Sequence, residues 1–127
     1  MNKTIIKTHK APVPAAPYSQ AVNIDKTIYV SGFVAFDPRT GKVVDGGIRE
    51  QATRVMESIK EVLGASGSSM EDVVKVNVYL TDMKDYGGMN EVFKNFFPKD
   101  PPARVTVGVK LPFPELLIEI DAIACIN

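Results

Sequence analysis

Residues 101–126 read PPARVTVGVKLPFPELLIEIDAIACI, and this stretch decides the fold. On both sides of a proline-containing break at residues 111–114, β-branched residues alternate with other residues in the period of two that is typical of strands. The sequence therefore predicts a β-hairpin whose two strands are joined by a proline-braced loop. In the first strand Arg104 and Thr106 share one face, and a row of valines shares the other.

Arg104 is the side chain with the clearest chemical potential in this stretch. If the two strands pair with like faces together, Arg104 and Thr106 project from the same surface as the carboxylates of Glu119 and Asp121. Arginine is suited to grip a carboxylate or phosphate through two parallel hydrogen bonds. The alternative is a cross-strand ion pair with Glu119 or Asp121, worth about 1 kcal/mol or less when exposed. The spacing alone favours the ion pair, and both interpretations stay open.

The composition is that of an ordinary globular protein. The chain has 127 residues, of which 45% are hydrophobic and 24% charged, so we expect one domain over residues 1–127. Fifteen basic residues balance fifteen acidic ones without clustering, which argues against a nucleic-acid or anionic-membrane partner. No apolar run approaches the roughly 18 residues of a membrane span, and the N-terminus lacks a signal-peptide apolar region. We expect a cytoplasmic protein.

Several kinds of catalytic machinery are missing from the sequence. His9 and Cys125 are the single histidine and the single cysteine, so the chain has no zinc-type cluster and no internal disulfide. It also has no glycine-rich phosphate loop. An enzyme with these residues would work without a metal or cofactor, through positioning, hydrogen bonds, one carboxylate and water. That chemistry suits a substrate that is already reactive and argues against amide hydrolysis.

Hydrophobic periodicity predicts alternating strands and helices along the chain. A helix is expected from Ile48 to Gly64, and a second one is expected after Thr81 or Asp82, or only after the Gly87-Gly88 pair, ending before Pro98. Strands are expected at residues 4–8, 27–36 and 74–81, in addition to the hairpin. Tyr18 follows a proline-rich segment and is either a packing anchor or the wall of a site.

This order predicts an α/β sandwich with a mixed sheet of about six strands and two helices on one face. The valine and isoleucine rows would meet the helices. The opposite face mixes polar, aromatic and apolar residues, a combination commonly covered by another subunit with a polar pocket at the seam. We therefore expect a small homo-oligomer. The residues predicted on that face are Tyr29, Ser31, Phe33, Asn77, Tyr79, Arg104, Thr106, Glu119, Ile123 and Cys125.

Short motifs along nearly the whole chain resemble those of the RidA family, also called the YjgF/YER057c/UK114 family. They are Ala11-Pro12, APYSQA at 16–21, VSG at 30–32, VKVNVYL at 74–80, MNEVF at 89–93, PAR at 102–104 and IEIDAIA at 118–124. The resemblance implies a bacterial-type chorismate-mutase-like fold assembled as a homotrimer, with clefts between subunits. It also implies hydrolysis of 2-imino acids such as 2-iminobutanoate and 2-iminopropanoate to 2-keto acids and ammonia, which protects pyridoxal-phosphate enzymes.

The resemblance also assigns roles to individual residues. Arg104 takes the position of the carboxylate-binding arginine, and Glu119 takes that of the acidic residue near the attacking water. Thr106 stands where the family often has cysteine or threonine and would hydrogen-bond the imine nitrogen or the tetrahedral centre. The positions matching cleft-lining residues are Tyr18, Ser31 and Asn90.

Two positions depart from the family pattern. Phe33 replaces the usual glutamine after Ser31-Gly32, and Ala16 stands where glycine commonly precedes the Pro-Tyr pair. We expect Phe33 to face the substrate side chain and to favour longer aliphatic imines. The alternative functions for such a chain are a ribonuclease or translation inhibitor, a holdase-like chaperone, and a non-catalytic trimer that binds 2-keto acids.

Overall fold

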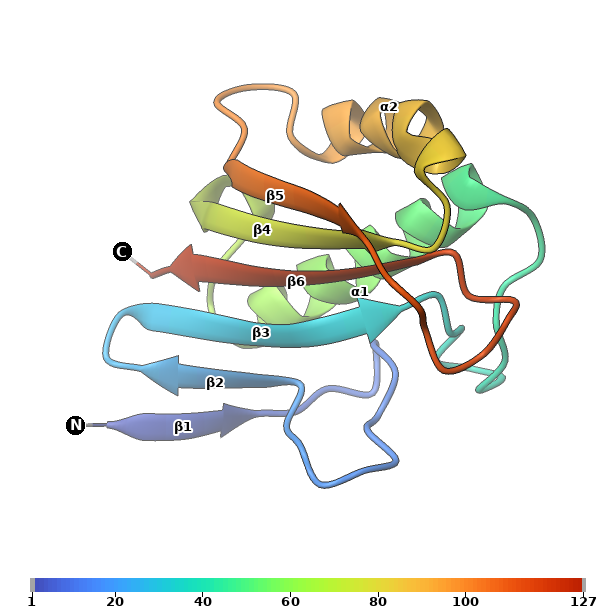
Figure 1. The fold of residues 1–127 in the computed structure, drawn as a ribbon. Coiled ribbons are helices and arrows are strands. Elements are labelled where there is room, and N and C mark those ends of the chain that lie inside the picture. Colours follow the sequence, from blue (N-terminus) through green and yellow to red (C-terminus); the bar gives the residue numbers. More distant parts are fainter. Residues whose placement is uncertain (1, 127) are drawn as a thin grey trace.

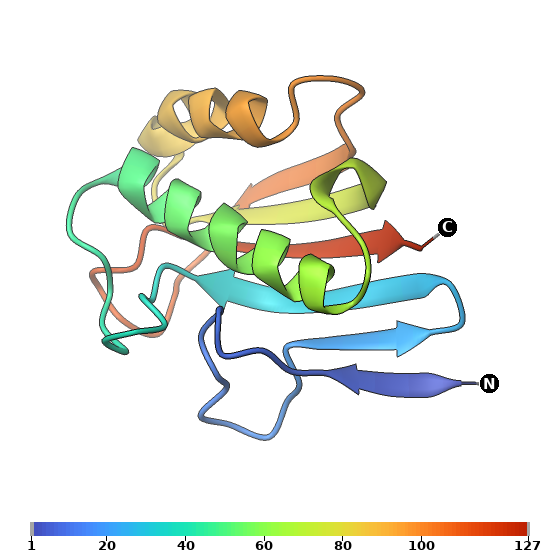
Figure 2. The same ribbon diagram turned by 180° about the vertical axis from the view of Figure 1, so that it is seen from behind.

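The computed structural model describes residues 2–126, and its centre is one six-stranded sheet with the strand order β1-β2-β3-β6-β4-β5. Helix α1 (Ile48–Ala65) crosses the face of the sheet that is hidden in Figure 1 and turned to the viewer in Figure 2, and α2 (Tyr86–Phe96) lies beside it. The predicted α/β architecture with two helices on one face of a mixed sheet is confirmed. The strands are β1 (Lys3–Ile6), β2 (Ala21–Ile24), β3 (Thr27–Val34), β4 (Val73–Leu80), β5 (Ala103–Gly108) and β6 (Ile118–Cys125), and two 3-10 turns are η1 (Met70–Asp72) and η2 (Met83–Asp85).

The predicted hairpin is wrong, because its two strands do not pair with each other. β6 runs antiparallel between β3 and β4, whereas β5 pairs in parallel with the far side of β4, at the edge of the sheet. The physical reason lies in the two sequences. β6 has a fully apolar inward row, from Ile118 to Ala124, that suits a central strand, while the row of β5 that faces the helices carries Arg104 and Thr106. Only an edge position leaves room for such polar side chains.

The core lies between the sheet and α1. Helix α1 begins at Ile48 as predicted, and Glu50 supports its start by accepting a hydrogen bond from the backbone N–H of Gly47 at 2.8 Å. Its apolar stripe packs on the inward rows of β3 and β6. Buried residues of this core include Ile28, Val30, Val55, Met56, Ile59, Val62, Leu63, Val76, Val78, Leu80, Ile118 and Ile120.

A β-bulge in β3 corrects the expected position of Phe33. The pairing of β3 with β6 shifts between Val30 and Phe33, so the alternation of side chains changes phase at Ser31-Gly32. Phe33 consequently faces the helices and is only 6% exposed, as part of the core. The expectation that it shares a face with Tyr29 is wrong, and its ring packs in the core instead of lining the open face of the sheet.

Helix α2 includes Gly87 and Gly88, so of the two expected starts the one after the glycine pair is wrong. It begins at Tyr86, after turn η2, at whose start the Asp82 side chain accepts a hydrogen bond from the backbone N–H of Lys84 at 2.9 Å. Gly88 has a packing reason to be glycine, because a Cβ there would lie 2.7 Å from Ile48 Cγ2 on α1. The close approach of the two helices outweighs the low helix propensity of glycine.

Strand β2 was not predicted from the sequence. Its four residues pair with both β1 and β3, in a region interpreted as a turn signal. Among residues 2–126, no helix combines the length and apolar character that crossing a membrane requires.

Candidate active site

Arg104 projects from β5 toward α2, and five groups on that helix hold it. Its Nη1 donates to Asn90 Oδ1 at 2.8 Å and lies 3.8 Å from Met89 Sδ, and its Nη2 donates to the Tyr86 hydroxyl at 3.0 Å. The guanidinium carbon lies 4.8 Å from the centre of the Phe93 ring and 5.6 Å from that of Tyr86. These contacts combine hydrogen bonds with cation–π attraction, so the guanidinium has a defined position in the free chain.

Thr106 shares the face of Arg104, as the alternation of the strand predicts. It pairs with Val78 of β4, which is fully buried, so its side chain also points to the helix side of the sheet. Its hydroxyl oxygen is buried and has no hydrogen-bond partner among the described residues. A buried hydroxyl without a partner is costly, which makes it a candidate to bind an atom from outside the chain.

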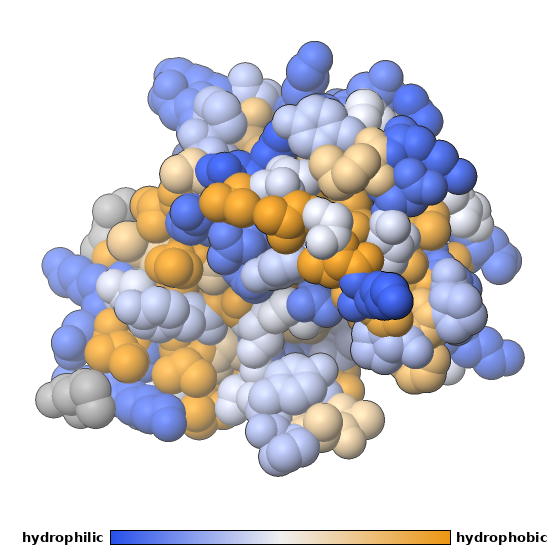
Figure 3. Space-filling model, in the orientation of Figure 1, coloured by the Kyte–Doolittle hydropathy of each residue, from blue (hydrophilic) through white to orange (hydrophobic). Residues whose placement is uncertain are grey.

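The valines of β5 face the opposite way from the prediction. Val105 and Val107 lie on the open side of the sheet and are 44% and 40% exposed. Seen in Figure 3, that open side carries hydrophobic patches separated by hydrophilic ones. Because β5 is the edge strand, its apolar row is not forced into the core and remains available for contact with another surface.

Glu119 lies on this open side, against the bulge of β3. A Cβ at Gly32 would lie 2.5 Å from Glu119 Oε2, so only glycine allows the carboxylate to occupy this place. This contact explains why a glycine stands inside the strand, since it lets the carboxylate approach the backbone closely. Burial, and secondarily the charge of Asp121, raise the pKa of the Glu119 carboxyl above its usual range.

Asp121 lies two residues further along β6 and is held by β4. It accepts hydrogen bonds of 2.8 Å from Asn77 Nδ2 and from the Tyr79 hydroxyl. The hydrogen bond to Asp121 is the main cause that raises the pKa of Tyr79. The sequence placed Asn77 and Tyr79 correctly on this face but did not connect them to Asp121.

Arg104 and Glu119 lie on opposite faces of the sheet, so the prediction that one surface carries both is wrong for a single chain. Arg104 pairs with Val76 of β4, and Val76 pairs with Ala122 of β6, so these three residues share the helix face. Glu119 pairs with Tyr79, which lies three residues beyond Val76 and therefore on the other face. The geometry also excludes the alternative ion pair between Arg104 and Glu119.

Ser31 connects the bulge to the N-terminal segment. Its hydroxyl donates to the Ser19 carbonyl at 2.6 Å, and its N–H donates to the Gln20 carbonyl at 3.0 Å. The buried Gln20 side chain accepts from the Thr8 N–H at 2.7 Å and donates to the Pro12 carbonyl at 2.9 Å, which fixes the loop. Tyr18 is 56% exposed, which argues against its interpretation as a packing anchor.

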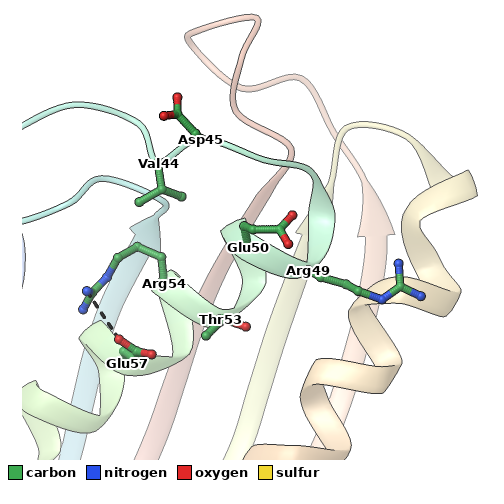
Figure 4. A pocket seen from close by; sticks show the side chains of 7 residues that line it. All are labelled: Val44, Asp45, Arg49, Glu50, Thr53, Arg54 and Glu57. Carbon is green, nitrogen blue, oxygen red and sulfur yellow. Dashed lines mark ion pairs between the residues drawn. The ribbon is translucent and has the colours of Figure 1, made fainter.

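Two surface hollows contain none of these residues. One, of about 400 Å³, lies at the start of α1, where Arg54 pairs with Glu57 at 3.4 Å and Arg49 points away toward α2 (Figure 4). The other, of about 1030 Å³, lies between the end of α1 and residues 95–100. Neither has Arg104 or Glu119 in its wall. Residues 2–126 also contain no group of three acidic, histidine or cysteine side chains placed to bind a metal ion.

Sequence comparison identifies the family. A sequence model of the family described as Endoribonuclease L-PSP, the RidA family, matches residues 8–126. The chain belongs to the RidA family.

RidA-family relatives match over almost their full length. A RutC family protein of Pyrococcus abyssi is 48% identical over 124 residues, covering 98% of both chains. The 2-iminobutanoate/2-iminopropanoate deaminase of Mus musculus is 43% identical over 122 residues, covering 96% of this chain and 90% of the mouse protein. The crystal structure of RidA from Psychrobacter sp. matches with a TM-score of 0.92 at 43% identity, covering 97% of this chain and 99% of that chain. The family and fold expected from the sequence motifs are thus confirmed.

The sequence analysis did not identify Tyr86, Met89 and Phe93 as partners of Arg104. Tyr86, Asn90 and Phe93 stand at positions i, i+4 and i+7, which places them on one helix face. That spacing was a usable signal, since two aromatic rings with an amide between them form a surface that suits a guanidinium.

Proposed function

We propose that this protein hydrolyses reactive 2-imino acids, such as 2-iminobutanoate and 2-iminopropanoate, to 2-keto acids and ammonia. The proposal is supported by family membership and by the name of the mouse relative. The observation that carries it is that this chain contains an ordered guanidinium and a carboxyl group with a raised pKa. Arg104 is held on α2 with a fixed guanidinium, and Glu119 is a carboxyl group whose pKa is raised above its usual range.

We further propose that the working form is a homotrimer with its sites between subunits. One chain holds Arg104 and Glu119 on opposite faces of its sheet, so a site that uses both needs Arg104 of one copy and Glu119 of a neighbour. The exposed apolar row of β5 and the open sheet face supply area for such contacts. Sedimentation of a stable monomer at micromolar concentration would contradict the trimer.

In the proposed mechanism the chain orients a reactive substrate and activates water. Arg104 binds the substrate carboxylate through two hydrogen bonds and directs C2 toward a water molecule. Glu119 takes a proton from that water as its oxygen bonds to C2 and the electron pair of the C=N bond moves to nitrogen, and Glu119 then passes this proton to the nitrogen. As the C–N bond breaks, Glu119 accepts the proton of the new hydroxyl group, the C=O bond of the 2-keto acid forms, and the proton passes to the nitrogen that leaves as ammonia. Thr106 donates a hydrogen bond to the nitrogen or the tetrahedral centre.

The direct test uses imino acid generated in place by a dehydratase or an amino-acid oxidase. Loss of imine and formation of 2-keto acid are followed with and without the protein. We expect acceleration by the protein, and a variant with Arg104→Ala is expected to give none. Binding of 2-keto acid without any acceleration would favour the non-catalytic binding trimer instead.

A second candidate function is RNA cleavage, which the description of the family favours. The balanced charge of the chain weighs against it, because an RNA-binding surface normally carries an excess of basic residues. Cleavage of RNA that weakens steeply with salt and disappears in Arg104→Ala would favour this function over imine hydrolysis.

A further inference from the structure

Tyr86 is the first residue of α2 and touches Arg104 in two ways. Its hydroxyl accepts a hydrogen bond of 3.0 Å from Arg104 Nη2, and its ring centre lies 5.6 Å from the guanidinium carbon. The ring is 41% exposed, so the core does not require a tyrosine here. The contact with Arg104 is what distinguishes this position from an ordinary surface residue of the helix.

The hydroxyl and the other partners of Arg104 constrain different parts of the guanidinium. Asn90 accepts from Nη1, Tyr86 accepts from Nη2, and Phe93 supports the flat side of the group at 4.8 Å. One hydrogen bond and one stacked ring still allow the guanidinium to turn in its own plane. The second hydrogen bond, on the other terminal nitrogen, removes that freedom. A planar fork that binds a carboxylate with two parallel bonds depends on this orientation.

We propose that Tyr86 is a positioning residue, and that its hydroxyl fixes the plane and direction of the Arg104 guanidinium for binding a small 2-oxo or 2-imino carboxylate. The inference rests on the proposed function for the identity of the ligand, but not for the contact itself. Tyr86 acts through Arg104, so its loss weakens recognition of the carboxylate and leaves the water-activating carboxyl of Glu119 unchanged.

The test compares Tyr86→Phe with the matched control Tyr29→Phe, in the full-length protein. Both variants remove one hydroxyl from an exposed tyrosine, and Tyr29, which is 49% exposed on β3, makes no contact with Arg104. The first measurement needs no ligand: the NMR signals of the Arg104 guanidinium in the free protein. We expect them to broaden in Tyr86→Phe and to remain unchanged in Tyr29→Phe. Arg104 guanidinium signals that stay as sharp in Tyr86→Phe as in the wild type would overturn the inference.

The second measurement is calorimetric binding of 2-oxobutanoate, which requires no turnover. We expect the Kd to rise roughly three- to tenfold in Tyr86→Phe, the size expected when one hydrogen bond to a charged group is lost and others remain. If imine hydrolysis is measurable, KM should rise by a similar factor while kcat changes little. Combining Tyr86→Phe with Arg104→Ala should give no further loss.

These outcomes separate the inference from the proposed function. Failure to accelerate imine hydrolysis, with intact binding and a Tyr86 effect on Kd, would reject the deaminase and leave the positioning role standing. If the guanidinium signals broaden in Tyr86→Phe while the Kd for 2-oxobutanoate is unchanged, Tyr86 holds Arg104 in place but does not contribute to carboxylate binding. That result rejects the inference.

Discussion

Arg104 occupies a position where the helix-facing row of the neighbouring strand β4 is apolar. Its pairing partner Val76 is 1% exposed, so the guanidinium leaves the sheet beside the core rather than in open water. The charge is tolerated because α2 supplies an amide, a hydroxyl and two rings at the same place. Glu119 shows the converse case, a carboxyl group that burial against the bulge makes harder to ionise.

Replacing Arg104 should abolish activity without unfolding the protein. Arg104→Ala removes the carboxylate grip, so we expect kcat/KM to fall at least about a hundredfold, as for the loss of charged hydrogen bonds. The unfolding free energy should fall by only about 1 kcal/mol, since mainly partly exposed contacts are lost. Arg104→Lys should restore little activity because lysine lacks the planar fork. Full activity in Arg104→Ala would remove the central assignment.

The raised pKa of Glu119 predicts a pH dependence of activity. Glu119 must be ionised to take a proton from water, so kcat/KM should fall as the pH drops through a range above the ordinary glutamate value of 4.5. Glu119→Gln should remove this limb of the profile together with most of the activity. A profile whose acidic limb lies at the ordinary value would mean that another group controls the step.

The same shift has a consequence for stability. Because Glu119 binds its proton more tightly in the folded chain, stability falls as the pH rises from 4.5 to the folded pKa, and the loss is complete above it. We expect Glu119→Gln to gain stability relative to the wild type across that window. Thermal unfolding over a pH series measures this difference, and a difference that shrinks with rising pH would contradict the assigned sign.

At the scale of elements, hydrophobic periodicity predicted which faces of the helices and strands are buried wherever neighbouring residues alone determine it. The stripe of α1 and the inward row of β6 follow from periodicity alone and were predicted correctly. The inward row of β4 was predicted correctly from Val76 to Leu80, but Val74 is 50% exposed because the register shifts between Val73 and Lys75. Phe33 was misplaced because a bulge, which changes the alternation, depends on what the partner strand and Glu119 require. The pairing of β5 was misplaced because adjacency in sequence was taken for adjacency in the sheet. Which strand pairs with which depends on how the whole sheet buries its apolar side chains. The sequence of one strand does not contain that information.

The glycine pair of α2 offers a matched test of helix–helix packing. Gly88→Ala brings a Cβ within 2.7 Å of Ile48 Cγ2, on a β-branched side chain that has little freedom to move. We expect a net loss of about 1–2 kcal/mol in unfolding free energy from overpacking, even after the gain in helix propensity.

Gly87→Ala is the control for this change, because a Cβ there meets nothing within 4 Å. It should stabilise the protein by up to about 1 kcal/mol through helix propensity alone. Denaturant unfolding of both variants measures the contrast. Equal stabilisation by the two substitutions would show that α1 and α2 separate more easily than their packing suggests.

At the scale of the whole molecule, the chain presents two half-sites rather than one site. The Arg104 half lies on the helix side at the edge strand, and the Glu119 half lies on the open side, where Gly32 and Asp121 surround it. The sequence predicted both residues and the need for a covering subunit, but it placed both residues on one surface. In the proposed trimer, the register of the sheet requires Arg104 of one copy to meet Glu119 of a neighbouring copy.

This arrangement predicts that two inactive variants restore activity when they assemble together. Arg104→Ala and Glu119→Gln chains, each with its own tag, are co-expressed and purified through both tags in sequence. Every cyclic trimer that contains both variants has one interface in three at which an intact Arg104 meets an intact Glu119. We expect about one third of the wild-type activity from the mixed trimers, and almost none from either variant alone. A double variant carrying both substitutions, mixed with wild-type chains, controls for assembly. If each site took both residues from the same chain, every site of the mixed trimer would lack one of them, and the mixture would remain inactive.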